Sequence, residues 1–505
     1  MFSPTTQREA PSTTSWELVP GSRSDLLREM YWAKTHEAAR VRVAVQGCGE
    51  ETLVGHARDF ATLLSFSDAF IQDHERIVGA SLAVPEDPEA LNLGHYDPHY
   101  PPGFATFVRL GLPGIRDQAR AQLKGETDPE KRDFLRAVEI SYDAACAYVK
   151  KYAVLAREMA GEEPDPVRRE ELLGIAAVCD ELSTSAPTSF YAALQLVQFV
   201  RVLGGRGCIG RFDQWLYPFY RHDVERGLLA PEETLELLED LFCKFNFFPA
   251  AYQAANDTLR NISLAGQTPE GEDGANELTY LCLAASAKLR LPEPKINVRF
   301  FHGSPPRLME ECCRFLAVGT NVLAVYNDEV VLPALDRLGI PVEDARQYCN
   351  DGCEELILGG MCTIRFRVYD SLPLLTETAY AAVAERPFPT FNQVMDDYRA
   401  RLQRYMPQDD PQENPITFPF FAASIEDCLA QASPTGARYN LYGSILSQVG
   451  DTADGLAAIQ KLIYEDKKLA WDEFTDALRA DYQGYEGLRQ MVRNRAPKYG
   501  NDDDR

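Results

Sequence analysis

Apolar residues recur every three or four positions along most of this chain, which is the spacing of helices that bury one face. The spacing predicts mostly helical structure over residues 25–70 and a loop-rich stretch over residues 84–114. Further helices are predicted over residues 115–123, 128–159, 166–182, 189–203, 231–245, 276–289, 305–318, 452–464 and 471–480.

Two short segments rich in β-forming residues, 295–301 and 322–326, lie between these helices and are predicted strands. Helices that alternate with strands are typical of parallel βαβ units, so the pattern predicts an α/β fold, either a barrel or an open sheet. Residues 1–25 are rich in Ser, Thr and Pro and are predicted to form a loose N-terminal arm.

Composition narrows the class of protein. The 505 residues are 45% hydrophobic, which is enough for a large core, and the net charge of −25 argues against nucleic-acid and anionic-membrane partners. The N-terminus has no apolar signal segment, and no run is long enough to span a membrane. The 12 cysteines form no regular framework, so we expect a cytoplasmic protein with reduced thiols.

The candidate chemistry lies in residues 348–360, YCNDGCEELILGG. If this segment is extended, Cys353 and Glu355 face the same side, because side chains two residues apart in a strand share a side. A thiol and a carboxylate aimed at one substrate suit a reaction that needs a sulfur centre and a proton acceptor. The alternative is a buried cysteine beside a surface carboxylate.

Several further segments occur in the order found in one known family. They are ERIVG (75–79), GHYDPHY (94–100), GRFDQ (210–214), YNDE (326–329) and KYGNDDD (498–504). Together with Gly352-Cys353-Glu354-Glu355, they resemble the glycyl radical enzymes, which include pyruvate formate-lyase. The resemblance covers about residues 70–505 and implies a ten-stranded α/β barrel of two five-stranded half-barrels. Residues 26–505 would form this pyruvate formate-lyase-type domain, with helices around the barrel.

The resemblance also implies a mechanism. A glycyl radical on a C-terminal loop takes hydrogen from Cys353, the resulting thiyl radical takes hydrogen from the substrate, and a leaving group departs. A sealed barrel interior would protect these radicals from water and oxygen. One cysteine followed by Glu at the second position is similar to the dehydratase branch, in which Glu355 would take the proton of a substrate hydroxyl. Pyruvate formate-lyase instead has two adjacent cysteines in this loop. Cys312 and Cys313 lie in a predicted helix, where they are expected to pack.

Family members continue beyond KYGNDDD to an R-V-x-G-Y loop that carries the radical glycine. No such segment follows residue 504, so we expect an incomplete barrel, an absent glycine radical domain and no bound cofactor. A small glycyl-radical subunit would supply the radical in trans, after installation by a radical-SAM activating enzyme. The substrate would be a small molecule, and a homodimer is compatible with the resemblance. Two alternatives stay open, a pyruvate formate-lyase-like C–C lyase and a non-catalytic barrel that binds a metabolite or partner.

The expected substrate pocket departs from the polyol dehydratases. Arg206 stands where they carry a hydroxyl-binding residue, so a glycerol-like polyol is disfavoured. The arginine is a candidate ligand for a carboxylate or sulfonate on the substrate, or equally a surface residue beside a Gly-rich turn. His95 is a candidate acid for the leaving group or a structural histidine, and Asp370 is a candidate substrate ligand. His99 replaces the Asp of the family's Pro-Asp pair, with an effect that the sequence does not define.

Residues 205–210 also fit the pattern G-x-G-x-x-G of dinucleotide-binding loops. This segment follows a helix rather than a strand, and residues 211–218 do not predict a clean helix, so we reject a dinucleotide site. No metal-ligand motif is present, and no metal site is expected.

Overall fold

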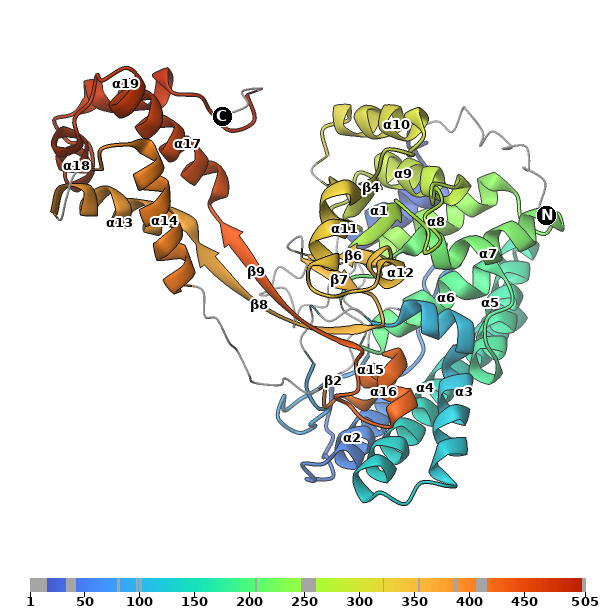
Figure 1. The fold of residues 1–505 in the computed structure, drawn as a ribbon. Helices are drawn as coiled ribbons and strands as arrows, with labels where there is room; N and C mark the ends of the chain where they lie inside the picture. The colour runs from blue at the N-terminus through green and yellow to red at the C-terminus, as the bar shows by residue number, and fades with distance from the viewer. Residues whose placement is uncertain are drawn as a thin grey trace. The chain divides into compact units, whose positions relative to one another are not determined.

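The computed structural model describes residues 16–32, 42–79, 82–96, 99, 102–204, 207–246, 260–320, 322–352, 355–384, 388–405 and 416–501. The chain divides into two units, each with its own core (Figure 1). Unit 1 comprises Met1–Ile364 and Asn414–Leu441, and unit 2 comprises Arg365–Glu413 and Tyr442–Arg505. This division is finer than the single domain that the sequence predicts for residues 26–505.

Helices dominate the first half of unit 1, and α4 lies against α2, α3 and α5. Three of the helices begin as their sequences predict, because Asp128, Asp165 and Ser189 accept hydrogen bonds from the first free backbone N–H groups. The helices are α1 (Arg23–Trp32), α2 (Leu53–Phe66), α3 (Phe104–Leu123), α4 (Pro129–Glu162), α5 (Pro166–Thr184), α6 (Phe190–Val202), α7 (Phe212–Glu225) and α8 (Pro231–Phe245).

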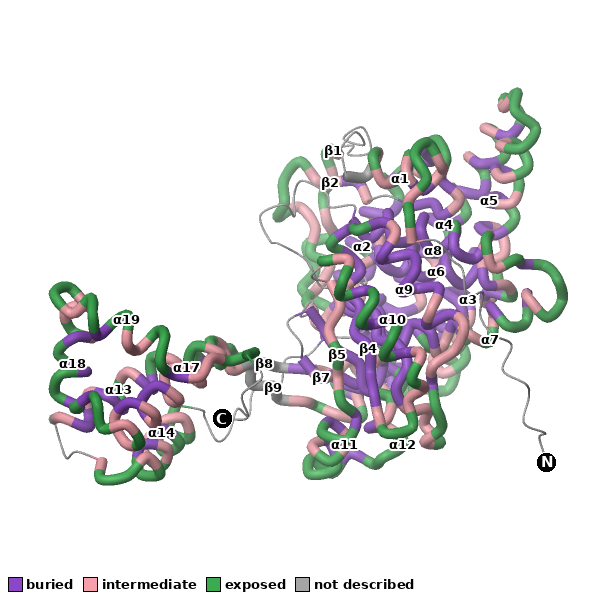
Figure 2. Tube along the Cα trace, turned by 90° about the horizontal axis from the view of Figure 1, so that it is seen from above, coloured by how far each residue is buried: buried purple, intermediate pink, exposed green. Residues whose placement is uncertain are grey.

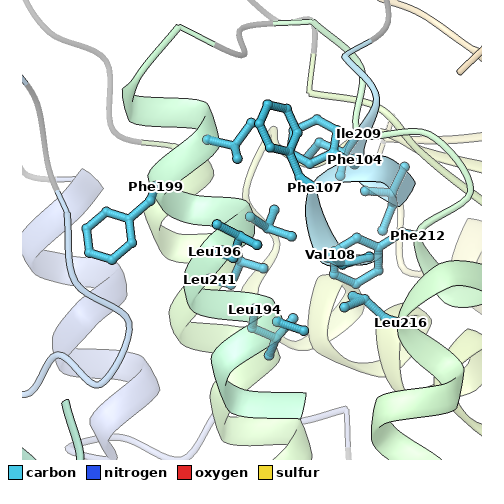
Figure 3. Packing of buried hydrophobic residues seen from close by; sticks show 14 of the residues in the cluster. Phe104, Phe107, Val108, Leu194, Leu196, Phe199, Ile209, Phe212, Leu216 and Leu241 are labelled. Atoms are coloured by element: carbon cyan, nitrogen blue, oxygen red, sulfur yellow. The ribbon is translucent and has the colours of Figure 1, made fainter. Parts of the chain in front are cut away.

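Helix α6 is buried on all sides and forms the centre of this core. Figure 3 shows Phe199 pointing to one side of α6, while Phe104, Phe107 and Phe212 lie on the other. Phe199 meets Tyr152 of α4 edge to face, with ring centroids 5.2 Å apart. The most buried backbone in Figure 2 accordingly runs through α4, α6, α8 and the sheet beside them.

The second half of unit 1 contains a parallel sheet of β3 (Ile262–Ala265), β4 (Ile296–Phe300) and β5 (Leu323–Asn327), in that order. Helix α9 (Glu277–Leu289) connects β3 to β4, and α10 (Pro306–Ala317) connects β4 to β5. The βαβ units predicted from the sequence are therefore confirmed. Every residue of β3 and β4 is buried, as in a parallel sheet that is covered on both faces.

A hairpin follows the sheet and leads to the candidate site. Strands β6 (Tyr348–Asn350) and β7 (Leu356–Leu358) pair antiparallel, and the Asn350 N–H donates to Ser263 Oγ of β3 at 3.2 Å. The remaining elements of unit 1 are β1 (Arg42–Val43), β2 (Val84–Pro85), α11 (Asp328–Asp336), α12 (Val342–Ala345), α15 (Pro419–Ala422) and α16 (Glu426–Gln431).

The chain passes between the units within two paired strands, β8 (Cys362–Asp370) and β9 (Tyr439–Ser447). Unit 2 has a small core around Trp471 and Phe474. Its helices are α13 (Ser371–Ala384), α14 (Phe391–Tyr405), α17 (Val449–Ile459), the π-helical η3 (Gln460–Glu465), α18 (Trp471–Arg479) and α19 (Glu486–Arg495).

The coarse prediction of a mixed α/β fold is confirmed. The helices predicted from residue 128 onward and both predicted strands lie where the pattern places them. Both cysteines lie in helix α10 as predicted. Cys312 is buried, which confirms its expected packing, whereas the expected packing of Cys313 is wrong because that residue is exposed. Among the described residues the hydrogen-bonded sheets contain two or three strands each, so the ten-stranded barrel is not resolved as one continuous sheet. None of the described helices combines the length and apolar character needed to cross a bilayer.

Three local predictions were wrong. Residues 212–225 form helix α7 directly after GRFDQ, because burial of Phe212, Leu216 and Tyr220 at helical spacing outweighs the internal Pro218. In the described parts of residues 25–70 the helices are α1 and α2, and the chain over 42–52 is non-helical. The predicted loop-rich stretch over residues 84–114 is helical from Phe104, where α3 begins. In the N-terminal arm, whose loose character stays a prediction, the Trp16 ring lies edge-on to Phe315 with centroids 6.3 Å apart.

Candidate functional site

The predicted catalytic loop connects β6 to β7 in unit 1. The Asp351 N–H donates to the carbonyl of Glu355 at 3.0 Å, and Lys295 Nζ donates to the carbonyl of Gly352 at 3.1 Å. These bonds extend the hairpin pairing beyond β6 and anchor the loop to the residue before β4. Cys353, with Glu354, lies outside the described residues, so the shared orientation of Cys353 and Glu355 stays a prediction.

Glu355 lies in the protein interior, and its side chain is only 2% exposed. His99 approaches it from a distant segment, with Nδ1 of the ring 3.4 Å from Glu355 Oε1. The same nitrogen lies 2.8 Å from Oδ2 of Asp351, whose side chain is fully buried. Two carboxylates of the loop and one imidazole therefore converge on a single point.

The electrostatics of this cluster follow from its burial. Burial alone would lower the pKa of His99, but its close contacts with the Asp351 and Glu355 carboxylates outweigh burial and raise that pKa to about 10. Burial raises the pKa of Asp351 to about 6 against the opposing influence of His99. In the absence of any other cation, the cluster at neutral pH holds an imidazolium beside the Asp351 carboxylate.

The base of the loop is fixed by a buried ion pair. Arg299 of β4 binds Asp328 through Nε at 3.0 Å and Nη2 at 2.8 Å, and neither side chain is exposed. Arg299 also donates to the carbonyl of Tyr348, and its guanidinium lies 3.8 Å from the centre of that ring. The Tyr348 hydroxyl returns a 2.7 Å hydrogen bond to Asp328. Because β6 begins at Tyr348, this network sets the position from which the loop departs.

The GRFDQ segment also has a scaffolding role. The buried guanidinium of Arg211 donates to the carbonyls of Ala265, Gln267 and Arg346, and burial lowers its pKa to about 9. Asp213 Oδ2 accepts from the N–H of Ala265 at 2.7 Å and from the Thr279 hydroxyl. The segment therefore connects α7, the end of β3 and the residues before β6.

The ERIVG segment forms a second buried anchor. Glu75 pairs with Lys244 of α8, and both side chains are almost completely buried. Asp240 of the same helix accepts from the N–H groups of Arg76 and Ile77 at 2.6 and 2.8 Å. These motif residues hold the chain before the loop-rich stretch against the helical core.

The other predicted site residues are distributed differently. His95 has an exposed side chain, and its carbonyl accepts from the Thr417 N–H at 2.8 Å. Asp370 belongs to unit 2, where it ends β8 and accepts a hydrogen bond from Ser447. Arg206 lies outside the described residues. The substrate-binding roles of these three residues stay predictions.

His99 and Asp351 are site residues that the sequence did not predict. The available signal for His99 was its position in GHYDPHY, where a base replaces an acid. Asp351 stands directly before Gly352-Cys353, but its burial beside His99 depends on contacts that no local pattern reveals.

The chain matches a family model described as pyruvate formate lyase-like over residues 88–381 and 385–505. It belongs to the pyruvate formate lyase-like family. The predicted resemblance to the glycyl radical enzymes is thereby confirmed, and the matched residues include GRFDQ and the cysteine loop.

Relatives in this family carry dehydratase names. The chain is 29% identical to the probable dehydratase YbiW of Escherichia coli over 82% of this chain and 58% of that protein. It is 30% identical to the trans-4-hydroxy-L-proline dehydratase of Clostridioides difficile over 79% of this chain and 56% of that protein. The chain thus spans a little over half the length of these curated relatives.

The fold is shared with solved structures of the family. The glycerol-bound B12-independent glycerol dehydratase of Clostridium butyricum superposes with a TM-score of 0.79 at 22% identity. The match covers 98% of this chain and 77% of that chain. At this identity the likeness establishes the fold.

Proposed function

We propose that this chain provides the thiol and the base of a radical carbon–heteroatom lyase of the dehydratase type. Glu355 carries the proposal, because a carboxylate two residues from the family cysteine lies in the interior of unit 1 with 2% of its side chain exposed. A buried carboxylate is costly unless it is paired or used in chemistry. Glu355 is paired with His99, and its family position and the names of the relatives support a role in chemistry in addition.

The steps assign one task to each side chain. The Cys353 thiyl radical takes a hydrogen atom from the substrate carbon that bears a hydroxyl group, and Glu355 accepts the hydroxyl proton. The bond from the neighbouring carbon to the leaving group then breaks, and its electron pair departs with that group. The product radical recovers a hydrogen atom from the Cys353 thiol, which leaves a carbonyl product.

The substrate is proposed to be a small, anionic molecule. Arg206 occupies a position at which the polyol dehydratases bind hydroxyl groups, and a guanidinium at that position favours a carboxylate or sulfonate. The relative named for trans-4-hydroxy-L-proline is a precedent for an anionic substrate.

The radical is proposed to come from another polypeptide. When present, a glycyl radical supplies the one-electron oxidation that Cys353 needs, and a radical-SAM activating enzyme would install it. The described residues supply the acid–base group and the anchored loop. We extend the proposal to the fold, with β3, β4 and β5 as consecutive strands of the family's ten-stranded barrel.

The proposal is tested by reconstituting the full chain anaerobically with a short R-V-x-G-Y polypeptide and an activating enzyme. The reconstituted protein is incubated with a panel of hydroxy acids, hydroxysulfonates and uncharged 1,2-diols, and carbonyl products are trapped with a hydrazine. We expect turnover of an anionic member, its loss in Cys353→Ala and a decrease of about 10²–10⁴-fold in Glu355→Gln. Cys313→Ala, which removes an exposed thiol of α10, is the matched control. Equal product formation by wild type and Cys353→Ala would refute the proposal.

A further inference from the structure

Three potential metal ligands converge at the base of the candidate loop. His99 Nδ1, Asp351 Oδ2 and Glu355 Oε1 all lie within 4.8 Å of one another. His99 comes from the loop-rich stretch before α3, whereas both acids flank Gly352 and Cys353 between β6 and β7. The three side chains are 14%, 0% and 2% exposed, so the cluster is an interior feature rather than a surface collection of acids.

A proton on the imidazole does not account fully for this geometry. Both carboxylates face the same ring nitrogen, at 2.8 and 3.4 Å, and an N–H group is directional toward one acceptor. Within the described residues, Asp351 Oδ2 is buried and makes no hydrogen bond of good geometry, although it points at His99. Oδ1 of the same carboxylate does accept one, from the Cys208 N–H at 3.1 Å. Oδ2 is therefore a buried oxygen that is aimed into the cluster.

The separations agree with a coordination sphere. With metal–ligand bonds of about 2.1 Å, neighbouring ligand atoms lie about 3.0 Å apart in octahedral and about 3.4 Å apart in tetrahedral geometry. The observed separations of 2.8 and 3.4 Å are close to these values. A cation at the common point would face all three atoms at once and would neutralise two buried carboxylates.

We propose that His99, Asp351 and Glu355 bind one divalent first-row transition-metal ion. One imidazole nitrogen with two carboxylate oxygens suits Mn²⁺, Fe²⁺ or Co²⁺ better than Ca²⁺ or Mg²⁺, which prefer oxygen ligands alone. The site goes beyond the lyase function. If Glu355 is the base of that reaction, the ion occupies its lone pair, and the metal-bound chain is an inhibited form.

The full chain is first treated with EDTA, the EDTA is removed, and the binding of Mn²⁺ to the chain is then measured. Mn²⁺ is chosen because the 12 cysteines would compete for Zn²⁺, whereas thiols bind Mn²⁺ weakly. Free Mn²⁺ is counted by EPR, and the heat of binding is measured by calorimetry. We expect one tight site per chain, with affinity lowered at least about tenfold in His99→Gln and in Asp351→Asn. His302→Gln, which changes an exposed histidine, should bind like wild type.

Circular dichroism and thermal unfolding of the EDTA-treated variants check that each variant folds. If His99→Gln does not fold, the test relies on Asp351→Asn, whose side chain has nearly the same shape as that of the wild type. Absence of tight binding, or binding that is equal in wild type, His99→Gln and Asp351→Asn, would overturn the metal site. The measurement uses neither substrate nor radical, so its failure leaves the lyase proposal standing. Conversely, tight Mn²⁺ binding by a chain that lacks lyase activity would support the metal site and contradict the lyase proposal.

Discussion

His99 Nδ1 lies 3.4 Å from Glu355 Oε1, and these two residues come from distant parts of the sequence. The contact places the residue that departs from the family's Pro-Asp pattern directly against the proposed catalytic base. An aspartate at position 99 would put a third carboxylate beside Asp351 and Glu355. With histidine, the same point carries two acids and one base, which changes its charge and allows it to bind a metal ion.

The variant His99→Asp is therefore expected to destabilise unit 1. A third buried carboxylate lacks a compensating cation, whereas His99→Asn introduces a side chain of similar size without the charge. At pH 7.5 in EDTA, we expect His99→Asp to lower the free energy of unfolding by about 1–3 kcal/mol more than His99→Asn. Urea unfolding measures the difference, and equal stabilities would show that the cluster tolerates an extra negative charge.

The buried pair between Lys244 and Glu75 gives a second prediction. Lys244→Met leaves the Glu75 carboxylate in the core without its cation, which should cost about 3–5 kcal/mol of the free energy of unfolding. The matched control is Arg221→Met, which breaks the exposed pair with Glu225 and should cost less than about 1 kcal/mol. If urea unfolding shows similar losses of unfolding free energy in the two variants, burial of the pair does not increase its contribution to stability.

The carboxyl group of Asp240 predicts a pH dependence. Burial raises its pKa in the folded chain from 3.8 to about 6. Because the folded state binds this proton more tightly than the unfolded state, the stabilisation is complete below pH 3.8 and is lost as the pH rises through 6. Between pH 5 and 7, wild type should lose about 1 kcal/mol relative to Asp240→Asn. A difference between the two proteins that stays constant over this range, in urea unfolding, would contradict the shift.

Arg299 should control the order of the candidate loop. Arg299→Lys keeps the positive charge but loses the fork that binds Asp328, Arg346 and Tyr348. We expect a loss of about 2–3 kcal/mol in the free energy of unfolding, with faster amide hydrogen exchange over residues 348–352. Arg479→Lys in α18 is the control, because its Asp476 partner is exposed. Unchanged exchange in the loop would show that the Arg299 network does not position it.

The sequence predicted those features that local patterns encode. Helical spacing located α4 and α5, and the alternation of strand and helix located β4 and β5. Helix α7 was missed because its stability comes from burial of Phe212 and Leu216 rather than from a cap. Short motifs identified the family and the Cys353 loop, since their order in the chain is itself informative.

The residues that surround Glu355 could not be predicted from local sequence patterns. Sequence spacing places Glu355 near Cys353, but the approach of His99 depends on tertiary packing of the loop-rich stretch. Likewise, Arg211 and Asp213 were recognisable as a family motif, yet only the hydrogen bonds to Ala265 and Thr279 reveal their scaffolding role.

The central claim, that Cys353 exchanges hydrogen with a glycyl radical, is tested most directly by EPR of the reconstituted chain in D2O without substrate. A glycyl radical gives a doublet because of its α-hydrogen, and a thiol hydrogen exchanges with solvent. If the hydrogen passes through Cys353, the doublet collapses in D2O for wild type and for Cys313→Ala but persists in Cys353→Ala. A doublet that collapses equally in Cys353→Ala, or that persists in wild type, would contradict the proposed role of Cys353.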